Sequence, residues 1–129
     1  MLQIGIKNKL TVSVTEENTA KALGSGMLDV FATPAMIALM EKTACESVQP
    51  FLEEGNGTVG TYLDVKHLAS TPIGVDVTCE SELIEIDRRR LVFSVTVRDE
   101  KELIGCGRHE RFIINNDKFM QKSEQKKLN

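Results

Sequence analysis

The stretch "VFATPAMIALMEKTAC", residues 30–45, decides the fold, because it predicts one long apolar helix. Thr33 is a suitable N-cap, and Pro34 suits the first helical position, where its missing N–H costs no hydrogen bond. Apolar residues recur at helical spacing from Met36 onward. Gly55 is the expected end, which gives about 20 residues and a length of about 30 Å. A helix this apolar must be covered by the rest of the chain.

Strands are predicted on both sides of this helix, because apolar and polar residues alternate there. One strand is expected before it and four after it, over residues 9–14, 58–70, 75–86, 90–98 and 102–114. Short turns join antiparallel neighbours, and a curved antiparallel sheet can cover one helix. The sequence therefore predicts an α+β fold.

The segments around these elements are expected to be minor. Thr15 would cap a short helix that ends at Gly24, between the first strand and the apolar helix. On the strand over residues 58–70, Val59, Thr61, Leu63, Val65 and His67 are expected on one face. The charged tail, residues 120–129, is expected to fray.

The composition is that of an ordinary soluble domain. The chain has 129 residues, of which 41% are hydrophobic and 27% charged, and its net charge is -3. We expect a single domain over residues 1–129, with no nucleic-acid partner because a negative chain is not attracted to a phosphate backbone. No apolar run reaches the roughly 18 residues of a membrane span, and the start lacks the apolar core of a secretory signal. We therefore expect no membrane partner and a cytoplasmic location.

Several kinds of chemistry are not indicated. Cys45, Cys79 and Cys106 lie far apart and form no CxxC pair, so neither a disulfide framework nor a metal site is expected. The sequence has no phosphate-binding glycine loop, no nucleophile-elbow serine and no HExxH zinc motif. We expect no cofactor. If the chain is a hydrolase, Glu41 has to be its base or nucleophile.

Glu41 is the one carboxylate inside the apolar run. Its neighbours three and four residues away are Ile37, Ala38, Ala44 and Cys45, none of which is charged. A glutamate at the solvent edge of the helix, or paired with an arginine from a strand, is one interpretation. Burying an unpaired carboxylate is costly, so a carboxylate held in a cleft for chemistry is the other.

Thr33 and His67 are further candidates. Thr33 is explained by helix capping, but a helix N-terminus also offers free N–H groups to a developing oxyanion. His67 shares an apolar strand face with Leu63 and Val65, so it is either a core histidine or a donor facing a cleft. His109, in "GRHER", is expected to be structural or to lie at a charged rim.

Three segments in order, "VFATPAMIALMEKTAC", "TVGTYLDVKHLAS" with "TPIG", and "GCGRHERFII", resemble the fluoroacetyl-CoA-specific thioesterase family over residues 24–119. The resemblance implies a hot-dog fold, in which a curved sheet wraps around a central helix, and a homodimer. It implies that Thr33, Glu41 and His67 form the catalytic set. Gly60 and Arg111 match further active-site positions of the family, for substrate binding.

The function implied is hydrolysis of a small acyl-CoA thioester to free acid and CoA. Glu41 would attack directly or activate a water molecule, and the sequence does not choose between these roles. The alternative is a non-catalytic acyl-CoA-binding or regulatory module on the same fold. The fluoroacetate-specific enzyme carries an aromatic lid before the helix motif, whereas residues 1–30 here contain no aromatic residue. The resemblance therefore does not extend to fluoroacetyl specificity.

Overall fold

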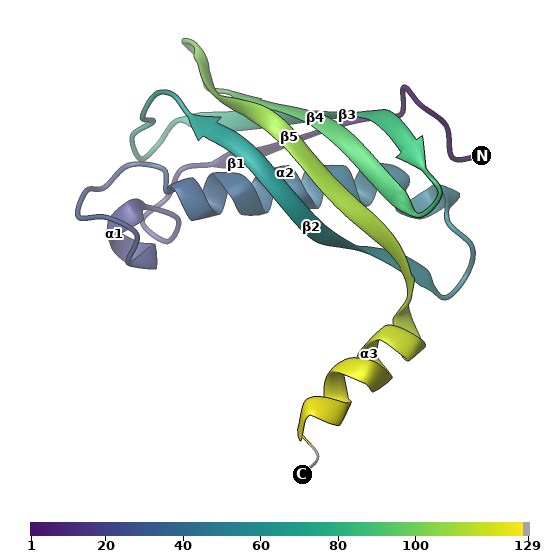
Figure 1. Ribbon diagram of the computed structural model, residues 1–129. Coiled ribbons are helices and arrows are strands. Elements are labelled where there is room, and N and C mark those ends of the chain that lie inside the picture. Colours follow the sequence, from purple (N-terminus) through teal and green to yellow (C-terminus); the bar gives the residue numbers. More distant parts are fainter. Residues whose placement is uncertain (128–129) are drawn as a thin grey trace.

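The apolar stretch forms helix α2 (Thr33–Val48), which lies across one face of a single sheet in the computed structural model (Figure 1). The structure describes residues 1–127. The sheet has five strands in the order β1-β3-β4-β5-β2, and every neighbouring pair is antiparallel. The strands are β1 (Lys7–Ser13), β2 (Asn56–His67), β3 (Asp76–Asp87), β4 (Arg90–Arg98) and β5 (Leu103–Asn115). The predicted α+β hot-dog fold is confirmed.

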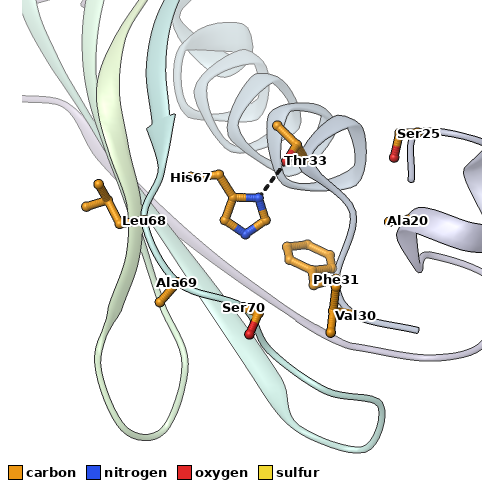
Figure 2. A pocket seen from close by; sticks show the side chains of 9 residues that line it. All are labelled: Ala20, Ser25, Val30, Phe31, Thr33, His67, Leu68, Ala69 and Ser70. Atoms are coloured by element: carbon orange, nitrogen blue, oxygen red, sulfur yellow. Dashed lines mark hydrogen bonds between the residues drawn. The ribbon is translucent and has the colours of Figure 1, made fainter. Parts of the chain in front are cut away.

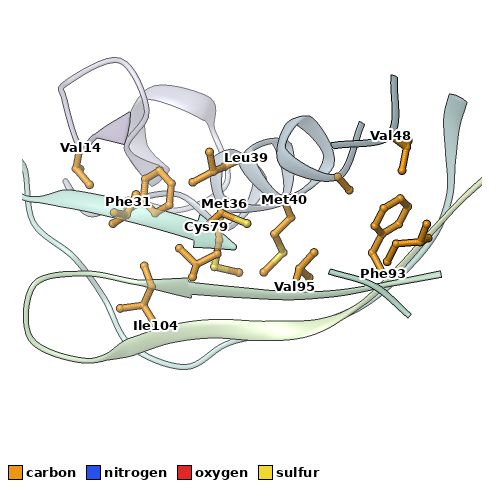
Figure 3. Close-up of a cluster of buried hydrophobic side chains, with 14 of the residues drawn as sticks. Val14, Phe31, Met36, Leu39, Met40, Val48, Cys79, Phe93, Val95 and Ile104 are labelled. Carbon is orange, nitrogen blue, oxygen red and sulfur yellow. The ribbon is translucent and has the colours of Figure 1, made fainter. Parts of the chain in front are cut away.

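The core lies between α2 and the sheet (Figure 3). The helix buries one stripe at spacings of three and four residues, formed by Met36, Leu39, Met40, Thr43, Ala44, Ser47 and Val48. The sheet covers this stripe with side chains that alternate along each strand, and on β4 these are Leu91, Phe93, Val95 and Val97, all fully buried. The periodicity in the sequence predicted both of these faces.

Both ends of α2 differ from the sequence prediction. Thr33 is the first helical residue and makes no capping bond, and Ala32 holds the N-cap position. The Thr33 hydroxyl instead bonds to His67, which explains why it is not available as a cap. The helix ends at Val48, because Pro50 lacks the N–H that the next turn would need, and the chain continues as the 3-10 turn η1 (Gln49–Phe51). Gly55, with φ +86°, belongs instead to the turn that leads into β2.

A β-bulge corrects the predicted face of β2. The pairing with β5 shifts between Gly60 and Tyr62, so Thr61 is an extra residue with no partner. Leu63 and His67 keep the predicted side, but Val59 and Thr61 do not share it. Thr58 and Gly60 face the helix in their place.

A short helix lies between β1 and α2. Helix α1 (Ala20–Leu23) is capped by Thr19, whose hydroxyl accepts the N–H of Ala22, and it ends at Gly24 as predicted. The cap is Thr19 rather than Thr15, because Thr15 is held in the preceding turn by Asn18.

Helix α3 (Asn116–Glu124) and the 3-10 turn η2 (Gln125–Lys127) extend away from the sheet (Figure 1) and bury no residue. The sequence predicted no helix here. Fraying of this tail stays a prediction, and residues 128–129 lie outside the described part. Within residues 1–127, none of the helices is both long enough and apolar enough to cross a membrane.

We expect Leu83→Ala to destabilise the fold strongly. Leu83 is fully buried in β3 and belongs to the core cluster. Removing a buried leucine side chain leaves a cavity that costs about 2–5 kcal/mol. Urea unfolding measures this loss. Leu28→Ala is the matched control, because Leu28 is 68% exposed, and it should change the free energy of unfolding by less than about 0.5 kcal/mol. Equal effects of the two substitutions would contradict this description of the core.

Candidate active site

The first part of the site joins the start of α2 to the end of β2. The Thr33 hydroxyl lies 2.7 Å from Nδ1 of His67. The two side chains meet because His67 is the last residue of β2 and points toward the first turn of the helix (Figure 2). The edge of the Phe31 ring faces the imidazole, at 6.5 Å between ring centroids. Thr33 and His67 thus form a hydrogen-bonded pair supported by a buried aromatic ring.

This pair lines a surface cavity of about 320 Å³. Its other walls come from α1 and the loop after it, with Ala20 and Ser25, and from the segment that follows β2, residues 68–70 (Figure 2). Nε2 of His67 is buried and has no hydrogen-bond partner within the described residues. A buried polar atom without a partner is costly, and one beside a cavity is placed to bind a ligand.

His67 is held in a state suited to proton transfer. Burial lowers the pKa of His67 below its usual value, and the nearby backbone of Ala69 opposes this in part. The imidazole is therefore neutral at neutral pH. A neutral imidazole can donate from one nitrogen and accept at the other.

The second part of the site is an ion pair at the middle of α2. Nη1 of Arg111, on β5, lies 3.4 Å from Oε2 of Glu41. The Arg111 side chain is only 7% exposed, whereas that of Glu41 is 39% exposed. Thr58 holds the Arg111 side chain in place. The Thr58 hydroxyl accepts a hydrogen bond from Nε at 2.8 Å, and the Thr58 carbonyl accepts one from Nη2 at 3.0 Å. A buried arginine thus supplies the positive charge for Glu41 that none of its uncharged neighbours on the helix provides.

Gly60 leaves room for this ion pair. It lies opposite Arg111 in the sheet and faces the helix. A Cβ atom at this position would overlap Oε2 of Glu41 and would lie 3.4 Å from Nη1 of Arg111. The absence of a side chain at Gly60 therefore lets the carboxylate approach the guanidinium.

His109 was placed by the sequence in a structural role or at a charged rim, and a rim position is wrong. It is fully buried, with Nδ1 2.9 Å from the carbonyl of Tyr62 and Nε2 3.2 Å from Nη1 of Arg111. Burial lowers its pKa, with the bond to Tyr62 acting in the opposite direction. His109 and Arg111 are two residues apart on one strand and so share a face, which is the signal that could have placed His109 inside.

The candidate residues form two groups. Thr33 and His67 are together at the start of α2, and Glu41, Gly60 and Arg111 are together farther along it, with no hydrogen bond between the groups in the described residues. Thr33 and Glu41 are eight residues apart, or about 12 Å along the helix axis. Within residues 1–127, no three His, Cys, Asp or Glu side chains are placed to hold a metal ion.

Comparison with known proteins identifies the family. A family model described as fluoroacetyl-CoA-specific thioesterase matches residues 14–117. A fluoroacetyl-CoA thioesterase from Streptantibioticus cattleyicolor is 43% identical over 98 residues, which are 76% of this chain and 70% of that protein. The chain belongs to the fluoroacetyl-CoA-specific thioesterase family. Members of this family are thioester hydrolases, and the chain is accordingly an enzyme of that class rather than a non-catalytic module.

Solved structures of the family agree with this assignment. A structure of the fluoroacetyl-CoA thioesterase FlK superimposes with a TM-score of 0.93 at 35% identity and covers 98% of both chains. A variant of that enzyme in complex with acetyl-CoA gives a TM-score of 0.93 at 34% identity, over 97% of this chain and 98% of that one. The family fold therefore extends over nearly the whole chain, including both groups of candidate residues.

We expect Gly60→Ala to reduce thioester hydrolysis by about tenfold or more, because the added methyl group would displace a catalytic or positioning carboxylate. The atom displaced is the end of the flexible Glu41 side chain, so the thermal midpoint should change little. Steady-state kinetics beside thermal unfolding measures both. Thr61→Ala, one residue away on the exposed bulge, should leave kcat unchanged. Normal kcat in Gly60→Ala would show that the position of the Glu41 carboxylate does not matter.

Proposed function

We propose that the chain hydrolyses a small acyl-CoA thioester to free acid and CoA, with Glu41 as base or nucleophile. The observation that carries this proposal is the Glu41 carboxylate, which is accessible to solvent yet held by a buried arginine in an otherwise apolar helix. Such a group is costly to maintain and has no evident role in packing. The acetyl-CoA complex of the FlK variant supports the same class of substrate.

Thr33 and His67 would act at the thioester carbonyl. When the Thr33 hydroxyl donates to Nδ1 of His67, the imidazole proton lies on Nε2, the atom that lacks a partner. Nε2–H would then donate to the oxyanion that forms as the carbonyl is attacked, or to the departing thiolate. The Thr33 hydroxyl fixes the orientation of the ring for this step.

Glu41 would supply the attacking oxygen. As a nucleophile, its carboxylate adds to the carbonyl carbon, the C–S bond breaks to release CoA thiolate, and water cleaves the resulting anhydride. As a base, it takes a proton from the water molecule that attacks. Arg111 orients the carboxylate in both schemes, and Gly60 leaves space for it.

The acyl group would be short. The cavity beside His67 measures about 320 Å³, at the lower end of the range for small-molecule sites. The only aromatic side chain in that wall is Phe31, which is 2% exposed and packs against His67. A buried Phe31 is not a mobile lid over the entrance, so we propose no selectivity for a fluorinated acyl group.

The substrate proposal is tested by thiol release from a panel of acyl-CoA thioesters. We expect turnover of acetyl-CoA and of its short homologues, with fluoroacetyl-CoA hydrolysed at a comparable kcat/KM. Absence of thiol release from every member would overturn the proposed function. Strong preference for fluoroacetyl-CoA over acetyl-CoA would overturn only the statement on selectivity.

The role of Glu41 is tested by Glu41→Gln, which keeps the size of the side chain and removes its charge. We expect kcat to fall by about 10²-fold or more, as for a lost base or nucleophile. His67→Ala should lower kcat less, because His67 only assists. Glu46→Gln on the same helix is the control, since Glu46 pairs only with exposed Lys42. A folded Glu41→Gln protein with normal kcat would contradict a catalytic role of Glu41.

We further propose a homodimer with its active clefts at the interface. Strand β2 is long and lies at the edge of the sheet, and Tyr62 and Leu63 are exposed on it. Such an edge is a template for pairing with a second chain. The backbones of Thr33 and Glu41 are about 12 Å apart along α2, and no hydrogen bond joins the two groups in the described residues. A dimer would let the partner subunit's Glu41 act with Thr33 and His67.

Co-expression of Glu41→Gln with His67→Ala tests this arrangement. If sites are shared, each mixed dimer keeps one intact site, and random pairing restores about a quarter of the normal activity. If each protomer holds a complete site, both halves of the mixed dimer are defective, and the activity stays at the mean of the two variants measured alone. Light scattering at micromolar concentration checks the mass, and a monomer would contradict the dimer directly.

A further inference from the structure

We propose that His109 is a positioning residue, which as a neutral imidazole protonated on Nδ1 holds Arg111 against Glu41. The proposal rests on the proposed function of Glu41, because it concerns how that carboxylate is oriented. His109 does not approach the cavity beside His67, and the catalytic roles above do not use it. Both of its ring nitrogens have a partner, and one of these partners is the guanidinium that holds Glu41.

The two contacts of His109 assign its proton. The carbonyl of Tyr62 can only accept a hydrogen bond, so Nδ1, at 2.9 Å, has to carry hydrogen. The guanidinium of Arg111 can only donate, so Nε2, at 3.2 Å, has to offer its lone pair. Both contacts require the same neutral tautomer. A charged imidazole would place a donor against a donor and a positive charge against another.

The bond from Arg111 to His109 also fixes the bond to Glu41. Arg111 donates both hydrogen bonds from the same atom, Nη1, which carries two N–H groups. Thr58 holds Nε and Nη2 of the same guanidinium. These three contacts leave two of the five N–H groups, one on Nη2 and one on Nη1, and the one on Nη1 points at Oε2 of Glu41. Loss of the acceptor on His109 would remove one of the contacts that hold the planar guanidinium, which would then be able to shift as a unit away from the carboxylate.

The surroundings favour the neutral form. From β4, the Phe93 ring packs against the imidazole at 6.2 Å between centroids, and from β5, Arg111 is the nearest cation. Burial is the largest cause of the low pKa of His109, and the charge of Arg111 adds to it. The carbonyl of Tyr62 on β2, Glu41 on α2 and Glu110 on β5 act in the opposite direction. The net direction is downward, in agreement with the tautomer that the contacts require.

Two substitutions separate positioning from packing. His109→Phe retains the ring that packs on Phe93 but has no acceptor for Arg111. His109→Gln can donate from its amide nitrogen to the Tyr62 carbonyl and accept from Arg111 at its amide oxygen. We expect kcat to fall by about tenfold in His109→Phe with KM nearly unchanged. His109→Gln should keep at least about half of the normal kcat.

The comparison of kcat with thermal stability distinguishes positioning from a structural role. Partial unfolding would scale kcat by the folded fraction, which the thermal midpoint reports, whereas loss of positioning lowers kcat in a protein that stays folded. Equal kcat for the two variants would overturn the positioning role.

Nitrogen NMR of the wild-type protein decides the tautomer without any substrate or variant of His109. The chain has two histidines, so the spectrum of His67→Ala assigns the signals of His109. We expect hydrogen on Nδ1, none on Nε2, and protonation only below the usual range for imidazole. Hydrogen on Nε2, or an ordinary titration, would overturn the assignment. A wild-type protein that hydrolyses no acyl-CoA would overturn the proposed function and the positioning role with it, whereas the tautomer would stand on this measurement.

Discussion

The fold depends on the burial of one stripe of α2 by a single sheet. A helix this apolar has to be covered along its length, and one curved antiparallel sheet is the simplest cover that a chain of this size can form. The strands nearest the helix in the middle of the sheet, β3 and β4, supply side chains that are fully buried. Because this contact is mostly apolar, Thr33 and Glu41 lie at its margin, whereas the buried hydroxyls of Thr43 and Ser47 donate to carbonyls of the helix itself.

The margin explains why the site has two parts. At the start of the helix, His67 at the end of β2 bonds to Thr33. Farther along the helix, Arg111 of β5 bonds to Glu41. Each part combines one polar residue of the helix with one of the strands at the same edge of the sheet. The fold thus determines which strands contribute to the two parts of the site, since β2 and its neighbour β5 bring the polar side chains that bond to Thr33 and Glu41.

Much of this could be predicted from the sequence, for identifiable reasons. The stripe on α2 and the buried face of β4 follow from simple periodicities, and they give the α+β fold without any relative. The pair of Thr33 with His67 could not be predicted from periodicity, because the same threonine is an equally good N-cap. The buried position of His109 was missed because its two charged neighbours, Arg108 and Glu110, belong to the opposite face of β5, where Glu110 pairs with Arg90.

The bulge at Thr61 was also not predicted. In a short segment that contains glycine, one unpaired residue does not visibly interrupt the alternation of apolar and polar residues. It nevertheless has a consequence for how this protein can change over evolutionary time. The bulge sets the phase between the two ends of β2, so that Gly60 and His67 face the helix although they are seven positions apart, an odd number. Deletion of Thr61 would remove the bulge and leave Gly60 and His67 six positions apart, still on the same face and with the same partners in β5. The bulge is therefore the place where this strand can lose one residue, whereas loss of one residue from a regular part of the strand, with the bulge kept, would turn either Gly60 or His67 outward.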